Sequence, residues 1–325
     1  MSTSLLGSVF HGPELITSER PSVLPNPLLR KYSRARRSQP DQYPNDSQNP
    51  TCKCDDRNAK QHIDQALTNF VNYVFILRLG QQDRLRLPDG PLHLSASGYA
   101  RMSVGPAVVI ADLARIGPDY LPGHAHADTL SFELSLRGRR VVVNSGTSVY
   151  GLGPERLRQR GTAAHSTVVI DGQNSSEVWS GFRVGRRAYP LGVQVARDGA
   201  VQRAEGAHDG YRHLPGAPRH FRAWRLSDSG LVLTDRVEGG RAHRVEARFH
   251  LAPGLCAVIH PDGAIRVMKE QGQPVLTLTT DGAIPEVEPS SWHPQFGQSL
   301  PSQVICLRAR ASSPFEIKTR FDWTD

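Results

Sequence analysis

The feature that most constrains this chain is a long succession of short strand-like segments separated by turn residues. From Ser97 onward, runs such as AVVIADL, TLSFELSL and GLVLTDRVE are separated by Gly, Pro, Asp or Ser. Within TLSFELSL, apolar residues alternate with polar ones, which is the period of a strand with one buried face. The 24 prolines and 29 glycines suit a chain with this many turns. We therefore expect a mainly β fold of the supersandwich type, in which two large antiparallel sheets pack face to face.

The N-terminal part of the chain has a different character. Residues 1–55 are rich in Pro, Ser, Asn and Arg and show no strand or helix period, which is typical of a disordered basic arm. Its run RKYSRARR could touch nucleic acid or a membrane surface, although a solvated linker is the more ordinary explanation. Over residues 56–80 the apolar side chains follow one helical stripe, which predicts a single amphipathic helix. The stripe consists of Ile63, Leu67, Phe70, Val74 and Leu77. The sandwich is then expected over residues 81–325.

A polar segment directly before one of the strands is the first candidate for a functional site. His124, His126 and Asp128 alternate with small residues in the sequence GHAHAD, which leads into TLSFELSL. If that strand extends back through His124, the spacing of two places all three side chains on one face, the polar face if the alternation continues in phase. Two imidazoles and one carboxylate on one face equally suit a metal site, a catalytic pair or a hydrogen-bonded cluster.

Two further polar residues lie at the ends of neighbouring strands. Asn144 ends the run RRVVVN, and His165 precedes the run STVVIDG. Because side chains at strand ends can converge, His126, Asn144 and His165 are candidates for a metal site with two imidazole nitrogens and one amide oxygen. That ligand set is electrically neutral, so we assign Asp128 as a supporting partner that fixes a histidine tautomer. The alternative is a group of buried polar residues that bridge two sheets by hydrogen bonds.

Positive charge is concentrated around this segment. The chain has a net charge of +8, which favours a polyanionic partner. The planar fork of arginine suits bidentate binding of carboxylate, sulfate or phosphate, whereas the alternative for any single arginine is an ordinary solvated surface position. Between residues 137 and 187 there are three acids, no lysine and nine arginines: Arg137, Arg139, Arg140, Arg156, Arg158, Arg160, Arg183, Arg186 and Arg187.

From about Ser97 to the C-terminus, the chain resembles the C-terminal β-sandwich domain of the heparinase II/III-like polysaccharide lyases. The resemblance is carried by GHAHADTLSFELSLRGRRVVVNSGTSVYG and ERLRQRGTAAHSTVVIDG, which follow the family's order and spacing. It implies β-elimination on an acidic polysaccharide that contains uronic acid, of the heparin, heparan or alginate kind. It also implies a place in the cell envelope or periplasm, although MSTSLLGSVFHGPE does not have the pattern of an export signal.

The resemblance also assigns roles within the histidine cluster. His124 matches the histidine of the family's catalytic cleft. His126, Asn144 and His165 match the positions that hold a zinc ion, with asparagine at 144 where the family has aspartate. This replacement weakens the case for zinc, because a neutral oxygen ligand leaves the charge of the ion less compensated.

Two arginines receive roles from the resemblance, and a turn tyrosine is a further candidate. Arg156 and Arg160, in the family's R-x-x-x-R-G-T run, are candidates for contacting sugar carboxylates, and the alternative is that they hold their loop through carbonyl oxygens. Tyr150, in the turn GTSVYG, is a candidate for contacting substrate and for acting as a substitute acid or base. A structural turn tyrosine is the alternative for this residue.

One part of the family's cleft is not expected in this chain. Family members carry an N-terminal (α/α) toroid that supplies a catalytic tyrosine and another histidine, and one helix within residues 1–96 cannot form a toroid. We therefore expect a lyase-like chain that carries out β-elimination directly or with a helical partner supplied by another chain, and we keep open that it is inactive or incomplete without this wall. The alternative is a non-catalytic module that binds acidic glycans through its arginines. Nucleic-acid binding is not expected without interleaved aromatic residues, nor is a membrane span without an apolar run of about 18 residues.

Overall fold

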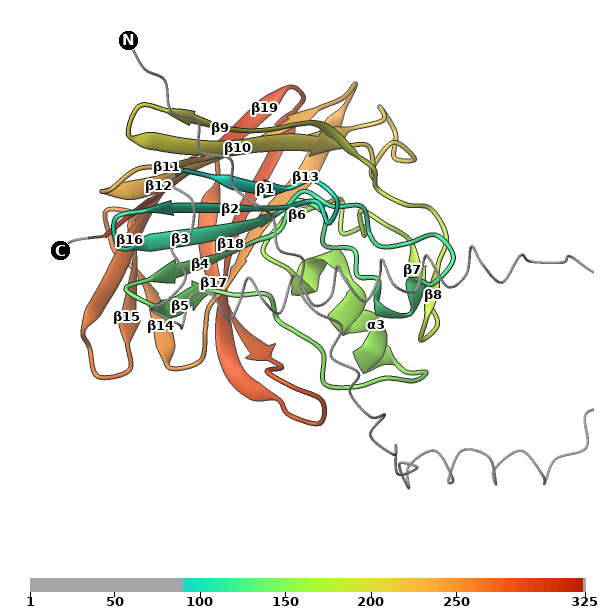
Figure 1. Ribbon diagram of the computed structural model, residues 1–325, viewed down its shortest axis with the longest axis horizontal. Coiled ribbons are helices and arrows are strands. Elements are labelled where there is room, and N and C mark those ends of the chain that lie inside the picture. Colours follow the sequence, from blue (N-terminus) through green and yellow to red (C-terminus); the bar gives the residue numbers. More distant parts are fainter. Residues whose placement is uncertain (1–89, 324–325) are drawn as a thin grey trace, which may run out of the picture. The chain divides into compact units, whose positions relative to one another are not determined.

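The computed structural model describes residues 90–323. The basic arm expected over residues 1–55 and the helix expected over residues 56–80 lie outside the described residues. Within residues 90–323 the chain is mostly β-strand, as expected, and the paired strands of every sheet are antiparallel (Figure 1). No helix in this part of the chain is long and apolar enough to cross a membrane.

The strands form three larger sheets and one two-stranded ribbon. The five-stranded sheet has the order β1 (Leu92–Leu94), β2 (Tyr99–Val104), β3 (Ala107–Asp112), β4 (Phe132–Leu136), β5 (Arg139–Val142). The eight-stranded sheet has the order β14 (Leu255–Ile259), β15 (Ile265–Lys269), β16 (Pro274–Asp281), β19 (Phe315–Asp322), β12 (Gly230–Glu238), β11 (Arg219–Leu226), β10 (Val201–His208), β9 (Pro190–Asp198). The four-stranded sheet has the order β17 (Ile284–Trp292), β18 (Leu300–Ser312), β13 (Ala242–His250), β6 (Val168–Ile170), and the ribbon consists of β7 (Val178–Trp179) and β8 (Arg183–Val184).

One aromatic cluster joins the three larger sheets. Phe132 of β4 contacts Trp224 of β11, Phe249 of β13 and Phe321 of β19, with ring centroids 6.0–6.3 Å apart and ring planes close to perpendicular. All four side chains are buried, and burying each one stabilises the fold by roughly 1.5–3 kcal/mol. The prediction of antiparallel sheets packed face to face is therefore confirmed, and the strands are shared among three sheets around one core.

The strand that follows GHAHAD begins later than expected. β4 starts at Phe132, because Leu130 has a φ of 65° and a left-handed residue breaks an extended strand. The prediction that the strand extends back through His124 is wrong: Pro122–His124 form a short 3-10 helix, η2, followed by a loop. These positions therefore share no strand face: His124 is exposed, whereas His126 and Asp128 are partly buried.

The loops that carry the candidate residues gather at one end of the sheets. Figure 1 shows the helix α3 (Pro154–Arg160) beside β7 and β8 at that end. A second 3-10 helix, η3 (Thr162–Ala164), follows α3 and leads into His165 and β6. The fold therefore brings the loop after η2, the helix α3 and the ribbon of β7 and β8 to one place.

Candidate functional site

The helix α3 buries polar side chains and exposes apolar ones. Pro154 stands at its first turn, where a missing N–H is tolerated. Its buried residues are Arg156, Gln159 and Arg160, whereas Leu157 is exposed. The sequence did not reveal this helix, because seven residues without an apolar stripe carry no helical signal.

Arg156 ties three loops together. Its Nε donates to the carbonyl oxygen of Gly181 at 3.2 Å, and one terminal nitrogen donates to that of Gly123 at 2.9 Å. The other terminal nitrogen lies 3.3 Å from Nε2 of His126. The guanidinium also lies over the ring of Tyr150, 4.6 Å from its centroid. The side chain is 1% exposed, so its hydrogen bonds fix the loops from beneath.

Arg160 has a similar role one turn further along the same buried face of the helix. Its three nitrogens donate to the carbonyl oxygens of Ala125, Ser180 and Arg183 at 2.9–3.3 Å. Burial lowers its pKa to about 10, which leaves it charged at neutral pH. Arg156 and Arg160 thus have the geometry of the second role considered for them, the holding of a loop through carbonyl oxygens. Their contact with sugar carboxylates stays a prediction.

His124 and Tyr150 form a pair at the surface above these arginines. Nδ1 of His124 lies 2.9 Å from the hydroxyl of Tyr150, and the two rings meet edge to face at 5.6 Å. Both residues are exposed. Tyr150 also stacks with Phe182 and Phe296, at centroid distances of 6.5 and 5.8 Å. The site therefore presents a hydrogen-bonded imidazole and phenol to solvent, beside aromatic side chains that are themselves exposed.

His126 and Asp128, both partly buried, converge with the fully buried His165. One ligand atom from each residue lies within 4.8 Å of the other two. Asn144 stands next to this group, with its Oδ1 3.2 Å from Nδ1 of His165 and accepting a hydrogen bond from the backbone N–H of Gly146 at 3.1 Å. The structure thus brings together all four residues that the sequence placed in or beside a metal site.

The surroundings favour neutral imidazoles in this group. Burial, with smaller contributions from Arg156, Arg160 and His124, lowers the pKa of His126 to about 3. Burial also lowers the pKa of His165 well below its ordinary value, and burial raises the pKa of Asp128 to about 7. Neutral imidazole is the form that binds metal ions.

A zinc ion fits these side chains. Nε2 of His165 is buried without a hydrogen-bond partner among the described residues, although buried polar atoms nearly always have one. If Nδ1–H of His165 donates to Asn144, the lone pair of Nε2 is left free to bind a metal ion. Imidazole nitrogens and a carboxylate oxygen are ordinary zinc ligands. The donor set that fits is His126, Asp128 and His165, with Asn144 orienting His165 rather than supplying the oxygen ligand.

Two residues near this site were not predicted from the sequence. His250, at the end of β13, lies 3.0 Å through Nε2 from the carbonyl oxygen of Ala163 in η3. Arg222 of β11 donates to the backbone oxygens of Leu130 and Ser166. Both lie in regular strands far from GHAHAD in the sequence, and only the packing of the sheets shows that they reach these loops.

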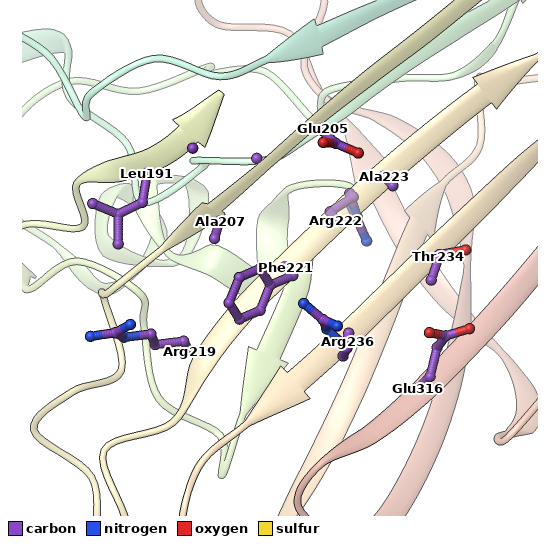
Figure 2. Close-up of a pocket in the computed structure, with 12 residues that line it drawn as sticks. Leu191, Glu205, Ala207, Arg219, Phe221, Arg222, Ala223, Thr234, Arg236 and Glu316 are labelled. Carbon is purple, nitrogen blue, oxygen red and sulfur yellow. The ribbon is translucent and has the colours of Figure 1, made fainter. Parts of the chain in front are cut away.

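A separate groove of about 480 Å³ lies on the eight-stranded sheet. Phe221, Arg219 and Arg236 stand along it, with Glu205 and Glu316 on the neighbouring strands (Figure 2). Small residues make it hollow, among them Gly206, Ala207 and Ala223. None of the predicted site residues lines this groove.

Comparison with known proteins agrees with this architecture. The sequence profile described as Heparinase II/III-like, C-terminal matches residues 87–323. The heparan sulfate lyase HepC from Pedobacter heparinus is similar, with a TM-score of 0.61 and 16% identity over 83% of this chain and 42% of that chain. A heparinase III structure gives a TM-score of 0.60 and 19% identity over 74% of this chain and 37% of that chain. The chain thus spans less than half the length of either protein, and the likeness shows the fold. No curated protein sequence matches the chain.

Proposed function

Because the chain belongs to the heparinase II/III-like family through its C-terminal domain, we propose that it carries out β-elimination on an acidic polysaccharide that contains uronic acid. The observation that carries the proposal is the His124–Tyr150 pair, whose nitrogen and hydroxyl lie 2.9 Å apart at the surface. An imidazole and a phenol at hydrogen-bond distance can serve as base and acid in one reaction.

The reaction assigns one proton transfer to each residue. With Nδ1–H of His124 donating to Tyr150, Nε2 carries the lone pair that removes the proton from the carbon next to the uronate carboxylate. The electron pair of that C–H bond forms the carbon–carbon double bond, and the bond to the glycosidic oxygen breaks. Tyr150 donates its hydroxyl proton to that oxygen. The Nδ1 proton of His124 then passes to the phenolate, which restores Tyr150.

The arginines below the pair supply fixed positive charge. Proton removal becomes easier when the charge of the uronate carboxylate is compensated. The guanidinium of Arg156 lies 4.6 Å from the ring centroid of Tyr150, and Arg160 holds the carbonyl oxygen of Ala125, next to His124. We assign both residues to substrate binding through their charge and through the loop conformations that they hold.

We assign zinc as the cofactor of the buried group. His126, Asp128 and His165 would hold the ion, with Asn144 orienting His165. When bound, the ion would compensate the carboxylate of Asp128 and cross-link the loop before β4 to the segment before β6. His124 lies two residues from His126, so the same cross-link holds the loop that presents the catalytic imidazole.

The family points to the substrate and to the location. The similar solved structures are a heparan sulfate lyase and heparinase III, so heparan-like polymers are the first substrates to test and alginate is the second. The cell envelope or periplasm is the location that family membership favours for an enzyme acting on such polymers.

The test is the formation of unsaturated product. Purified protein is incubated with heparin, heparan sulfate, chondroitin sulfate and alginate, and the ultraviolet absorbance of the new double bond is followed. We expect product from at least one polymer, and we expect loss of product in the His124→Ala and Tyr150→Phe variants. His93→Ala, at an exposed position of β1, is the control. Binding of a polymer without product from any of them would contradict the proposal and favour a non-catalytic binding module.

A further inference from the structure

A buried guanidinium on β11 connects the two segments that carry the zinc ligands proposed above. One terminal nitrogen of Arg222 donates to the carbonyl oxygen of Leu130 and to that of Ser166, each at 2.8 Å. Leu130 follows Asp128 by two residues, and Ser166 directly follows His165. A single side chain thus joins the backbone of the loop before β4 to the backbone of the segment before β6.

The other nitrogens of Arg222 are held in place by Asp235. Nε and the second terminal nitrogen donate to the two carboxylate oxygens at 2.7 and 2.9 Å. Asp235 stands on β12 directly opposite Arg222 in the register of the two strands. Both side chains are at most 1% exposed. Because the fork is bidentate and buried, the guanidinium has little freedom to move relative to the sheet.

Two histidines fix the carboxylate from its other side. Nε2 of His220 lies 2.7 Å from Oδ1 of Asp235, and Nδ1 of His220 lies 3.3 Å from Nε2 of His208. Nδ1 of His208 accepts a hydrogen bond from the backbone N–H of Gly210. The polar chain from Gly210 to Arg222 is therefore continuous and lies within the sheet, on β10, β11 and β12.

The loop conformation at Leu130 requires such support. Leu130 has a φ of 65°, and it is a residue whose side chain disfavours the left-handed region. A residue in that region persists only where its surroundings hold it. The bond from Arg222 to the carbonyl oxygen of Leu130 acts at this position, immediately before β4 begins.

Stability of the core alone does not require this arrangement. A buried ion pair can often be replaced by apolar residues of similar volume without loss of stability. An apolar pair, however, cannot donate hydrogen bonds to two backbone oxygens from different loops. The charged pair therefore has a role besides stability: it holds these two carbonyl oxygens at a fixed separation.

We infer that Arg222, anchored by Asp235, is a positioning residue that sets the spacing between the segment of His126 and Asp128 and the segment of His165. It contacts neither the substrate nor the proposed zinc ion. The expected effect of Arg222 on zinc affinity rests on the proposed function. Its effect on the conformation of the two loops rests on the hydrogen bonds alone.

The experiment separates positioning from stability with two variants. Arg222→Met/Asp235→Leu replaces the whole pair by apolar side chains. Arg222→Lys keeps a positive charge beside Asp235, but its single nitrogen cannot donate to both carboxylate oxygens of Asp235 and to both carbonyl oxygens at once. Val267→Ala, buried on β15 at the far side of the eight-stranded sheet, is the control for general destabilisation. Amide hydrogen exchange is measured for residues 126–131 and 165–168, and zinc affinity is measured by calorimetric titration.

Both Arg222 variants are expected to exchange these amides on the order of tenfold faster than the wild type and to bind zinc about 10–100-fold more weakly. Val267→Ala is expected to leave the relative protection of these segments unchanged. Unchanged exchange in a folded double variant would overturn the inference, and so would equally faster exchange in Val267→Ala. The exchange measurement requires neither zinc nor activity, so its result is independent of whether the proposed function holds.

Discussion

Acid stability should depend in part on His250, a buried histidine that supports the site. His250 is 3% exposed, and its two ring nitrogens lie 3.0 Å from the carbonyl oxygen of Ala163 and 3.1 Å from the hydroxyl of Ser290. Burial first, and the neighbouring Arg248 second, lower its pKa from 6.5 to about 3. His250 therefore stays neutral in the folded protein, where it holds the turn that leads into His165.

The direction of the pH effect follows from this difference. Below pH 6.5 the unfolded chain binds a proton at His250 that the folded chain does not bind, so the free energy of unfolding falls as the pH falls from 6.5 towards 3. One proton corresponds to about 1.4 kcal/mol per pH unit. By about pH 4.5 the loss from His250 alone reaches about 3 kcal/mol.

The variant His250→Gln isolates this contribution, because glutamine does not titrate. At about pH 7.5 the variant should be less stable than the wild type by about 1–2 kcal/mol, since the hydrogen bonds to Ala163 and Ser290 are disturbed. As the pH falls its stability should decline less steeply, so the two curves should cross near about pH 5.5. The assay is urea unfolding at a series of pH values, with His93→Gln at an exposed position of β1 as control. Parallel curves for wild type and His250→Gln would refute the reasoning.

Three further predictions concern the zinc group, the loops and the core. Asp128→Asn should weaken zinc binding more than Asn144→Ala does. In Asn144→Ala, loss of the hydrogen-bonding partner should lower the zinc affinity by about 10–100-fold. Equal losses of affinity in the two variants, measured by calorimetry, would contradict the assignment of Asp128 as ligand. Arg156→Ala should lower the free energy of unfolding by about 2–5 kcal/mol, because it leaves buried carbonyl oxygens without donors, whereas the exposed Arg197→Ala should change it by less than about 0.5 kcal/mol. Phe132→Ala should cost about 3–5 kcal/mol in urea unfolding, and a value below about 1 kcal/mol would contradict its place in the core of all three sheets.

The sequence predicted most of the fold where strands have one buried face. Alternation in TLSFELSL and GLVLTDRVE is a direct consequence of the pleat, and both segments contain strands. β10 and β17 lack a clear strand pattern for identifiable reasons. VQRAEGAH in β10 has small or polar residues at buried positions, including Gly206, and IPEVEPSSW in β17 contains two prolines, which normally argue against a strand.

The candidate site was predicted in part. His126, Asn144 and His165 were grouped from their positions at strand ends, and the structure brings them together. The separate roles of Asn144 and Asp128 could not be assigned, because they depend on which side-chain atoms face the buried Nε2 of His165. The inward position of Arg156 could not be predicted either, since an arginine buried among carbonyl oxygens has the same sequence pattern as one on the surface.

The most direct test of the account is the reaction of the His124–Tyr150 pair. Wild type, His124→Ala and the control His93→Ala are compared by their initial rates of ultraviolet absorbance on heparan sulfate and on the other uronic acid polymers. We expect unsaturated product from the wild type and from His93→Ala, and a rate lower by about 100–10,000-fold in His124→Ala, the usual contribution of a general acid or base. Product formation that persists at the wild-type rate in His124→Ala, or its absence from every polymer that the wild type binds, would contradict the account.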